Sequence, residues 1–267
     1  MADARRAAPI LEVRGLDVYY GRSHALQGVD LTLDSGVLSV VGRNGMGKTT
    51  LCKTIMGLVR ATGGSVRMGG EDLLSLQPAQ IARLGVGYVP QGRRLWRSLT
   101  VDEHLRMTAS MRRGAWTVER IYDTFPRLAE RKNNGGGQLS GGEQQMLAIS
   151  RALVTNPRLL IMDEPTEGLA PVIVAQVEEM LVRLGEEGDI SVLVIEQNIG
   201  VATAVSKNVA IMVNGRVNRL IESARLAADR NLQQEVARRE ARKRREPTRR
   251  PSRRISITAF RIFPSCS

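Results

Sequence analysis

The sequence has little cysteine and little histidine, and this excludes two common kinds of structural support. The only cysteines are Cys52 and Cys266, which are too few for a disulfide framework. The only histidines are His24 and His104, so no His/Cys cluster indicates a structural metal. We therefore expect the fold to depend on its hydrophobic core, with Cys52 as a small core residue.

Long apolar runs are also absent. No stretch approaches the ~20 residues that a membrane-spanning helix needs, and residues 1–6 lack the apolar centre of a secretory signal. The chain has 267 residues, of which 42% are hydrophobic, enough for one large domain or two small ones with a real core. These features predict a cytoplasmic protein.

Positive charge is abundant but concentrated at one end. The net charge is +12, and residues 236–267 contribute +9 of it, with eleven Arg or Lys against two Glu. Basic proteins often bind nucleic acid or anionic membranes, but here that inference applies only to the tail. We expect residues 1–9 to be flexible and residues 236–267 to be a basic, largely disordered tail, since its end is rich in Arg, Pro and Ser.

Apolar patterns predict an α/β fold between these two ends, over residues 10–235. Residues 10–20 and 25–33 alternate between apolar and polar side chains, which is typical of half-buried antiparallel strands. The strands and helices that follow alternate along the chain, which predicts a mostly parallel sheet with helices on both faces. Residues 92–157 are mainly helical and interrupt this alternation, so we expect them to form an inserted helical subdomain.

Three further local patterns complete the prediction of secondary structure. Residues 48–59 are expected to form a helix that turns Leu58 inward. Asn214-Gly215 lies between two alternating runs and predicts a closing hairpin. Residues 223–245 could form a last helix.

A glycine-rich loop follows the continuous apolar run at residues 37–41. It fits the pattern of Gly, four residues and Gly-Lys-Thr, in which backbone N–H groups at a helix N-terminus bind phosphates. We expect Lys48 to reach the β- and γ-phosphates and Thr49 to bind Mg²⁺. Alone, the pattern also fits a glycine-rich turn with an ordinary surface lysine. The candidate nucleotide-binding residues of this segment are Gly42, Arg43, Asn44, Gly45, Met46, Gly47, Lys48, Thr49 and Thr50.

Two acidic residues end a second buried apolar run, residues 159–162. Asp163 is expected to bind Mg²⁺ directly or through water, which strengthens the phosphate-loop interpretation. Glu164 would lie beside the γ-phosphate as the general base or the residue that orients water. The alternative for Glu164 is a helix-capping or solvated acid.

A third segment places the turn Ser140-Gly141-Gly142 at the start of a helix, which is a second anion-binding arrangement. Together the three segments resemble the ATP-binding cassette (ABC) family, over about residues 11–221. The resemblance implies an α/β P-loop NTPase of the ABC type, with a mostly parallel sheet core, an antiparallel β subdomain and an inserted helical subdomain. It also implies a head-to-tail pair in which Ser140, Gly141 and Gly142 of one subunit complete the ATP site of the other.

The resemblance assigns roles to two further residues and implies ATP and Mg²⁺ as ligands. Gln91 is similar to the glutamine that contacts Mg²⁺ or the attacking water, although it could be an ordinary polar loop residue. Tyr20 matches the aromatic residue that stacks on adenine, although it could be a strand-end aromatic; Tyr19 is the weaker candidate.

Gln197 departs from the family, which mostly has histidine at this position in contact with the γ-phosphate. A glutamine amide can hydrogen-bond phosphate or water but cannot become cationic near neutral pH. Either catalytic activity is lost, or Gln197 holds the water without charge. We favour the second interpretation because the other catalytic residues are present.

The same segment indicates a branch of the family. Glu196-Gln197-Asn198, the surroundings of Gln91 and Ser140, and residues 165–171 resemble the cassettes of importers for branched-chain amino acids and of the closely similar urea and short-amide importers. This implies an ATP-hydrolysing subunit at the cytoplasmic face of the membrane. Its partners would be a second cassette, identical or different, two permease subunits and an extracytoplasmic solute-binding protein.

Two other classes remain as alternatives. A soluble ABC ATPase acting on ribosomes or DNA would usually carry a second cassette or a long coiled-coil insertion, and this chain has neither, so no nucleic acid is expected. The interpretation as a regulatory cassette, which binds ATP without hydrolysing it, depends on Gln197 alone.

Residues 93–96 begin the inserted subdomain, where the family binds a permease coupling helix. We favour a core position for Trp96 over a contact with the permease.

Overall fold

The computed structural model describes residues 8–109, 112–229 and 232–233. The predicted tail at residues 236–267 and most of the predicted N-terminal segment at residues 1–9 lie outside these ranges. So does much of the helix predicted at residues 223–245.

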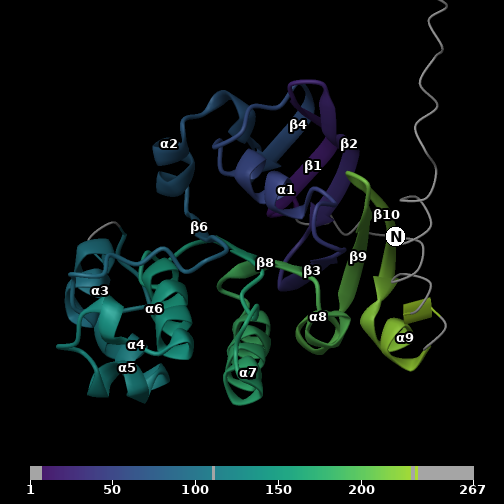
Figure 1. Cartoon of the computed structure of the whole chain (residues 1–267). Coiled ribbons are helices and arrows are strands. Elements are labelled where there is room, and N and C mark those ends of the chain that lie inside the picture. Colours follow the sequence, from purple (N-terminus) through teal and green to yellow (C-terminus); the bar gives the residue numbers. More distant parts are fainter. Residues whose placement is uncertain (1–7, 110–111, 230–231, 234–267) are drawn as a thin grey trace, which may run out of the picture.

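Two sheets form the framework of the chain (Figure 1). The smaller sheet is antiparallel, with the strand order β2-β1-β4-β5. The larger sheet has the order β10-β9-β3-β8-β7-β6 and is parallel except for the β9–β10 hairpin. The strands are β1 Leu11–Tyr20, β2 Ser23–Leu33, β3 Val37–Val41, β4 Gly63–Met68, β5 Glu71–Asp72, β6 Val86–Val89, β7 Leu159–Asp163, β8 Ser191–Glu196, β9 Asn208–Val213 and β10 Arg216–Glu222.

Helices cover the parallel sheet, and four of them cluster beyond the end of β6 (Figure 1). This cluster comprises α3 to α6, and α7 lies beside it below the sheet in the view of Figure 1. The described helices are α1 Lys48–Ile55, α2 Pro78–Arg83, α3 Val101–Ala109, α4 Val118–Thr124, α5 Pro126–Glu130, α6 Gly141–Leu153, α7 Pro171–Glu187, α8 Ile199–Val205 and α9 Ser223–Ala228, with 3₁₀ turns at Leu73–Ser75 and Gly136–Gln138. The predicted fold class, including the antiparallel and helical parts, is confirmed.

The core is divided between the two faces of the parallel sheet. One apolar cluster joins α3, α4, α6 and α7 to one face, and a second joins α1 and the antiparallel sheet to the other. All five residues of β7 are buried, as expected for a central strand covered on both faces. This strand is therefore held rigidly, and so is the position of the acidic residue at its end.

The first helix is shorter than predicted. It ends at Ile55, and Gly57 follows with a φ of 68°, a left-handed conformation that stops helix propagation. As a result Leu58 is 55% exposed, and the expectation that it points inward was wrong.

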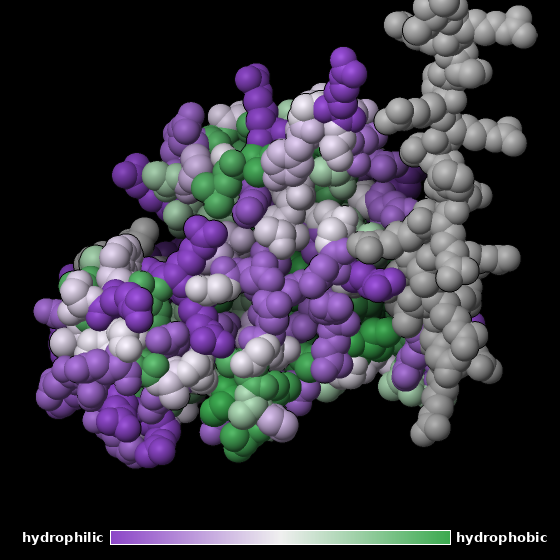
Figure 2. All heavy atoms as spheres, viewed as in Figure 1, coloured by the Kyte–Doolittle hydropathy of each residue, from purple (hydrophilic) through white to green (hydrophobic). Residues whose placement is uncertain are grey.

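On the face seen in Figure 2 hydrophilic and hydrophobic residues are mixed, and one of the apolar areas lies over α7. Val172 at the start of this helix is 64% exposed. Among the described residues, no helix is both long and apolar enough to cross a lipid bilayer.

Candidate functional site

The parallel strands bring the candidate residues to one edge of the sheet. The chain leaves β3 into the loop at residues 42–47, leaves β6 toward Gln91, and leaves β7 and β8 at Asp163 and Glu196. In parallel sheets of this kind, ligands bind outside the carboxyl ends of the strands. Segments that are far apart in the sequence therefore meet at one place.

The glycine-rich loop wraps around the N-terminus of α1. Gly47 is the N-terminal cap with a φ of 99°, a conformation that strains any residue with a Cβ atom, and a Cβ there would lie 2.8 Å from the carbonyl oxygen of Ala25. A Cβ on Gly42 would overlap the carbonyl oxygen of Met212. The Lys48 ammonium group donates to the carbonyl oxygens of Gly42 and Arg43, at 2.6 and 3.0 Å.

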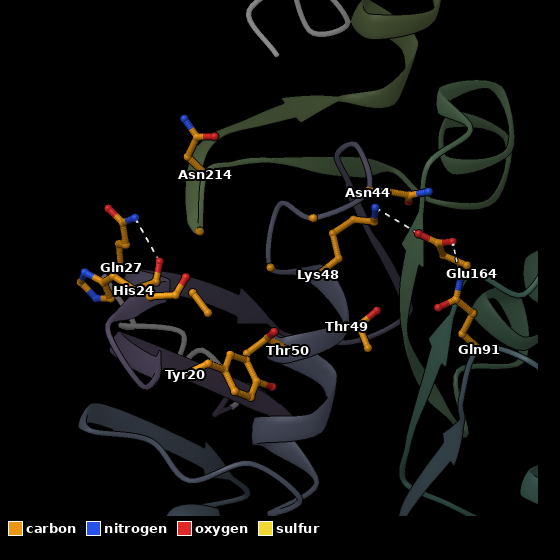
Figure 3. Close-up of a pocket in the computed structure, with 15 residues that line it drawn as sticks. Tyr20, His24, Gln27, Asn44, Lys48, Thr49, Thr50, Gln91, Glu164 and Asn214 are labelled. Atoms are coloured by element: carbon orange, nitrogen blue, oxygen red, sulfur yellow. Dashed lines mark hydrogen bonds and ion pairs between the residues drawn. The ribbon is translucent and has the colours of Figure 1, made fainter. Parts of the chain in front are cut away.

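Glu164 is the centre of a chain of polar contacts (Figure 3). The Nζ of Lys48 lies 3.1 Å from Oε1 of Glu164, and both side chains are almost fully buried. The amide of Gln91 donates to Oε2 of Glu164 at 3.1 Å and to Glu167 at 2.8 Å. The structure thus brings together Lys48, Glu164 and Gln91, as the sequence predicted.

Asp163 lies one residue earlier and contacts the first turn of α1. The Thr49 hydroxyl donates to Oδ1 of Asp163 at 3.1 Å, and the Tyr88 hydroxyl lies 3.5 Å from Oδ2. Burial raises the pKa of the Asp163 carboxyl, and the neighbouring Glu164 charge adds to this, while the Thr49 hydrogen bond opposes it. Among the described residues, no group of three or more His, Cys, Asp or Glu side chains is arranged to hold a metal ion.

Lys48, Gln91 and Glu164 border a cavity of about 690 Å³ that extends to the β1–β2 hairpin (Figure 3). Tyr20, half exposed, lines its far end. Of the predicted site residues, the cavity is lined by Tyr20, Asn44, Gly45, Gly47, Lys48, Thr49, Thr50, Gln91 and Glu164, whereas Gly42, Arg43, Met46, Asp163 and Gln197 are not among its lining residues.

Six lining residues were missed by sequence reasoning: Ser23, His24, Ala25, Gln27, Asn214 and Gly215. Asn214-Gly215 was identified only as a hairpin turn. In the structure the Gly215 N–H donates to the carbonyl of Met46 at 2.9 Å, and the Gln27 N–H donates to the carbonyl of Gly215 at 2.8 Å. The turn between β9 and β10 therefore packs on the phosphate loop, a contact that no local sequence signal reveals.

The Ser140 turn lies elsewhere. Ser140 caps α6: its hydroxyl accepts the Glu143 N–H at 3.3 Å, and its own N–H donates to the Glu143 carboxylate at 2.8 Å. Ser140 and Gly142 line a different cavity, between α4, α5 and α7. Within one chain the structure does not bring Ser140 to Lys48.

Gln197 follows β8 and its side chain is exposed. Its backbone N–H donates to the buried Glu196 carboxylate at 3.1 Å. Gln197 therefore follows β8, which pairs with β7, the strand that ends at Asp163.

One expectation about the inserted helices was wrong. Trp96 is not in the core but 49% exposed, and the guanidinium of Arg151 lies 4.4 Å from its ring centroid. This cation–π contact stabilises the Trp96 ring at the surface, where the long Arg151 side chain covers part of it. Trp96 instead borders the start of the helical cluster.

Comparison with known proteins decides the family. The sequence model described as "ABC transporter" matches residues 26–167, more than half of the chain. The chain belongs to the ABC transporter family. It is an ATPase cassette of that family, the kind of subunit in which ATP hydrolysis is coupled to transport, and the predicted resemblance is confirmed.

Among curated relatives, the cassette is 40% identical to the high-affinity branched-chain amino acid transport ATP-binding protein BraG of Pseudomonas aeruginosa, over 76% of this chain and 88% of that protein. It is 36% identical to the probable branched-chain amino acid transport ATP-binding protein LivF of Archaeoglobus fulgidus, over 76% and 87%. It is 31% identical to the branched-chain amino acid transport ATP-binding protein BraF of Pseudomonas aeruginosa, over 78% and 89%.

Solved structures agree on the fold. The cassette superposes on an ABC transporter cassette in its ADP conformation with a TM-score of 0.73 and 25% identity, over 86% of this chain and 99% of that one. A dimeric bacterial ABC transporter cassette gives a TM-score of 0.71 and 27% identity, over 80% and 98%. ABC cassettes thus bind adenine nucleotides and can dimerise.

Proposed function

We propose that this cassette is the ATP-hydrolysing subunit of an importer for branched-chain amino acids. The observation that carries the proposal is the 40% identity to BraG across most of both chains, since BraG is named for this transport. LivF and BraF, named for the same transport, support it. Because a cassette does not touch the transported molecule, urea or another short amide is the alternative cargo.

The geometry supports a specific role for each residue around the phosphate loop. The backbone N–H groups of residues 42–50 would bind the ATP phosphates at the N-terminus of α1, where the helix dipole favours anions. The Lys48 ammonium group would leave the carbonyl oxygens of Gly42 and Arg43 and the Glu164 carboxylate, and would bind the β- and γ-phosphates instead. Tyr20, half exposed at the far end of the cavity, would stack on adenine.

The residues present fit a magnesium ion brought with ATP. Mg²⁺ in such sites is held by one or two protein oxygens together with phosphate oxygens and water, so a large cluster of acids is not needed. The Thr49 hydroxyl and the Asp163 carboxylate, 3.1 Å apart, would supply these two oxygens. The ion would neutralise phosphate charge as it builds up during hydrolysis.

Hydrolysis would depend on Glu164, Gln91 and Gln197. Once Lys48 has moved to the phosphates, Glu164 would be free to accept a proton from the attacking water or to orient it. Gln91, already hydrogen-bonded to Glu164, would contact the same water or Mg²⁺. Gln197 would hold the γ-phosphate or the water through its neutral amide.

A second cassette would complete each ATP site. Ser140, Gly141 and Gly142 lie at the N-terminus of α6, away from Lys48 of the same chain, and this supports a role at a nucleotide held by a partner cassette. The dimeric relative supports such a pair. Pseudomonas aeruginosa has both BraF and BraG, and this favours a pair of two different cassettes.

The permease pair would bind at a basic cleft between the sheet and the helical cluster. This cleft, of about 730 Å³, is lined by five arginines: Arg83, Arg93, Arg94, Arg112 and Arg151. No acidic side chain is among its lining residues, so a cytoplasmic permease segment with acidic side chains would complement it. The assembly would lie at the cytoplasmic face of the membrane and receive cargo from an extracytoplasmic solute-binding protein.

Uptake measurements test the cargo. Cells of the native host that lack this gene should lose uptake of labelled leucine, isoleucine and valine but keep that of urea. The wild-type gene should restore uptake, and a Glu164→Gln gene expressed at the same level should not. Loss of urea uptake with normal amino acid uptake would reassign the importer to urea.

A further inference from the structure

A buried carboxylate that the mechanism above does not use lies beside the site. Glu196 is the last residue of β8 and is only 3% exposed. Its strand pairs with β7, so that Ile195 is opposite Asp163. Burying an ionisable group in this way is costly unless its hydrogen bonds are satisfied.

The Glu196 carboxylate joins two loops of the site. Its Oε1 accepts the Thr166 hydroxyl at 2.7 Å and the Thr166 N–H at 3.2 Å. Its Oε2 accepts the Gln197 N–H at 3.1 Å. One side chain therefore ties the turn that follows Glu164 to the loop that carries Gln197.

The turn after β7 contains a residue in a strained backbone conformation, which hydrogen bonds to β8 hold in place. Glu164 has a φ of 51°, a left-handed conformation that residues with a side chain rarely adopt and that persists only where the surroundings hold it. Its N–H donates to the carbonyl oxygen of Ile195 at 2.9 Å. Two residues later Thr166, itself buried, is held by Glu196. The strained residue is thus fixed to β8 on both sides.

A carboxylate suits this position better than an amide would. The Thr166 hydroxyl, the Thr166 N–H and the Gln197 N–H all donate to it, and only a carboxylate presents acceptors on both of its terminal atoms. Burial raises the pKa of the Glu196 carboxyl, and the hydrogen bonds from Thr166, Asn198 and Gln197 oppose this by favouring the charged form.

We propose that Glu196 is a positioning residue for ATP hydrolysis, whose carboxylate holds the turn of Glu164 and the loop of Gln197 in one fixed arrangement. Glu196 does not touch ATP or the attacking water; it acts through Glu164 and Gln197, the two residues proposed to contact them. This inference rests on the proposed role of Glu164. It adds that Glu164 can fill this role only while Glu196 holds its turn in place. Since small displacements of a catalytic group are costly, loss of the tie should slow hydrolysis more than it weakens nucleotide binding.

The test uses the purified full-length chain and the variant Glu196→Gln. An amide keeps the shape but places a donor against either Thr166 or Gln197. We expect kcat for ATP hydrolysis to fall about tenfold to a hundredfold while KM changes less than about threefold. Glu222→Gln, which changes an exposed glutamate at the end of β10, is the matched control and should hydrolyse ATP like the wild type.

A second variant keeps the test decisive if Glu196→Gln does not fold. Thr166→Val removes only the hydroxyl that donates to Oε1, so kcat should fall by a smaller factor. The double variant should be no slower than Glu196→Gln alone, because both changes break the same tie. A kcat within about twofold of the wild type in the folded variants would overturn the proposal. So would equal losses in kcat and nucleotide affinity, which indicate general damage.

Failure of the proposed function has a different signature. If Glu164→Gln hydrolysed ATP as fast as the wild type, the role of Glu164 would be wrong whatever Glu196→Gln did. If Glu164→Gln is inactive and Glu196→Gln is normal, only the positioning role is wrong.

Discussion

Lys48 and Glu164 form a buried ion pair, with Nζ 3.1 Å from Oε1 and side-chain exposures of 3% and 6%. Both side chains point into the cavity that would hold ATP (Figure 3). With Lys48 in its proposed role, the γ-phosphate and Glu164 would compete for one ammonium group. ATP binding would release Glu164 at the moment when its carboxylate is needed.

This competition gives the first prediction. Glu164→Gln should lower ATP hydrolysis by at least about a hundredfold, as expected for loss of a general base. ATP affinity should stay the same or increase, because Lys48 no longer pairs with a charged side chain. Hydrolysis and equilibrium binding would be measured on the same preparation. Glu187→Gln, at a surface ion pair with Arg120, is the control. A large loss of affinity in Glu164→Gln would contradict the account.

The second prediction concerns the adenine end of the cavity. Tyr20→Ala should weaken ATP binding by about 1–3 kcal/mol, the usual contribution of base stacking on an aromatic ring. Tyr19→Ala should have little effect, because the Tyr19 ring is already stacked on the His24 ring, with 4.0 Å between the ring centroids. Titration calorimetry with ATP would compare the two variants. Equal losses of ATP affinity in the two variants would contradict the assignment of Tyr20, rather than Tyr19, as the ring that stacks on adenine.

The third prediction concerns magnesium. Thr49→Val removes the hydroxyl that contacts Asp163 and should abolish the extra thermal stabilisation that Mg²⁺ adds to ATP. The measurement is the melting temperature with ATP, in the presence of Mg²⁺ or of a chelator. Thr54→Val, which removes a hydroxyl bonded to its own helix, should keep the wild-type difference. A preserved difference in Thr49→Val would exclude Thr49 as a ligand.

The fourth prediction concerns the residue that departs from the family. Gln197→Ala should impair ATP hydrolysis, and Gln197→His should retain it, since either side chain can hydrogen-bond phosphate or water. Steady-state hydrolysis at saturating ATP is the measurement. If the alanine variant turned over at the wild-type rate, Gln197 would have no catalytic role.

The fifth prediction concerns pH and stability. Burial lowers the pKa of His104, whose Nε2 accepts the Trp96 N–H while Nδ1 contacts the Thr100 carbonyl. Below about pH 6.5 the unfolded chain protonates this histidine more readily than the folded one, so His104 destabilises the fold as pH falls through that range. Denaturant unfolding at about pH 7.5 and 5.5 should show a larger loss for the wild type than for His104→Gln. Equal losses would contradict this.

Much of the site could be predicted because its signals are local. The phosphate loop, the acids after β7 and the capped start of α6 each occupy a few consecutive residues with a defined chemistry. The rule that ligands bind at the carboxyl ends of parallel strands then places the first two together. The alternation of strands and helices predicts the mostly parallel sheet, and the resemblance to the ABC family supplies the rest of the confirmed fold class.

The rest depends on contacts between distant segments. The Asn214-Gly215 turn lines the cavity because the β9–β10 hairpin packs on the phosphate loop, and Gln27 of β2 contacts this turn there. Trp96 was expected in the core since aromatic residues usually pack there, but Arg151, 55 residues later, covers its ring at the surface. The hydrogen bonds between Glu196 and Thr166 likewise join the end of β8 to the turn after β7, and these two residues are 30 positions apart in the sequence.

The central claim is that the cassette works within a membrane importer, and capture of its assembly tests this most directly. Tagged Glu164→Gln protein would be purified with ATP from detergent-solubilised membranes of the native host, and its partners identified by mass spectrometry. The account predicts two permease subunits and a second cassette. Ribosomal proteins or DNA-bound partners without a permease would contradict it.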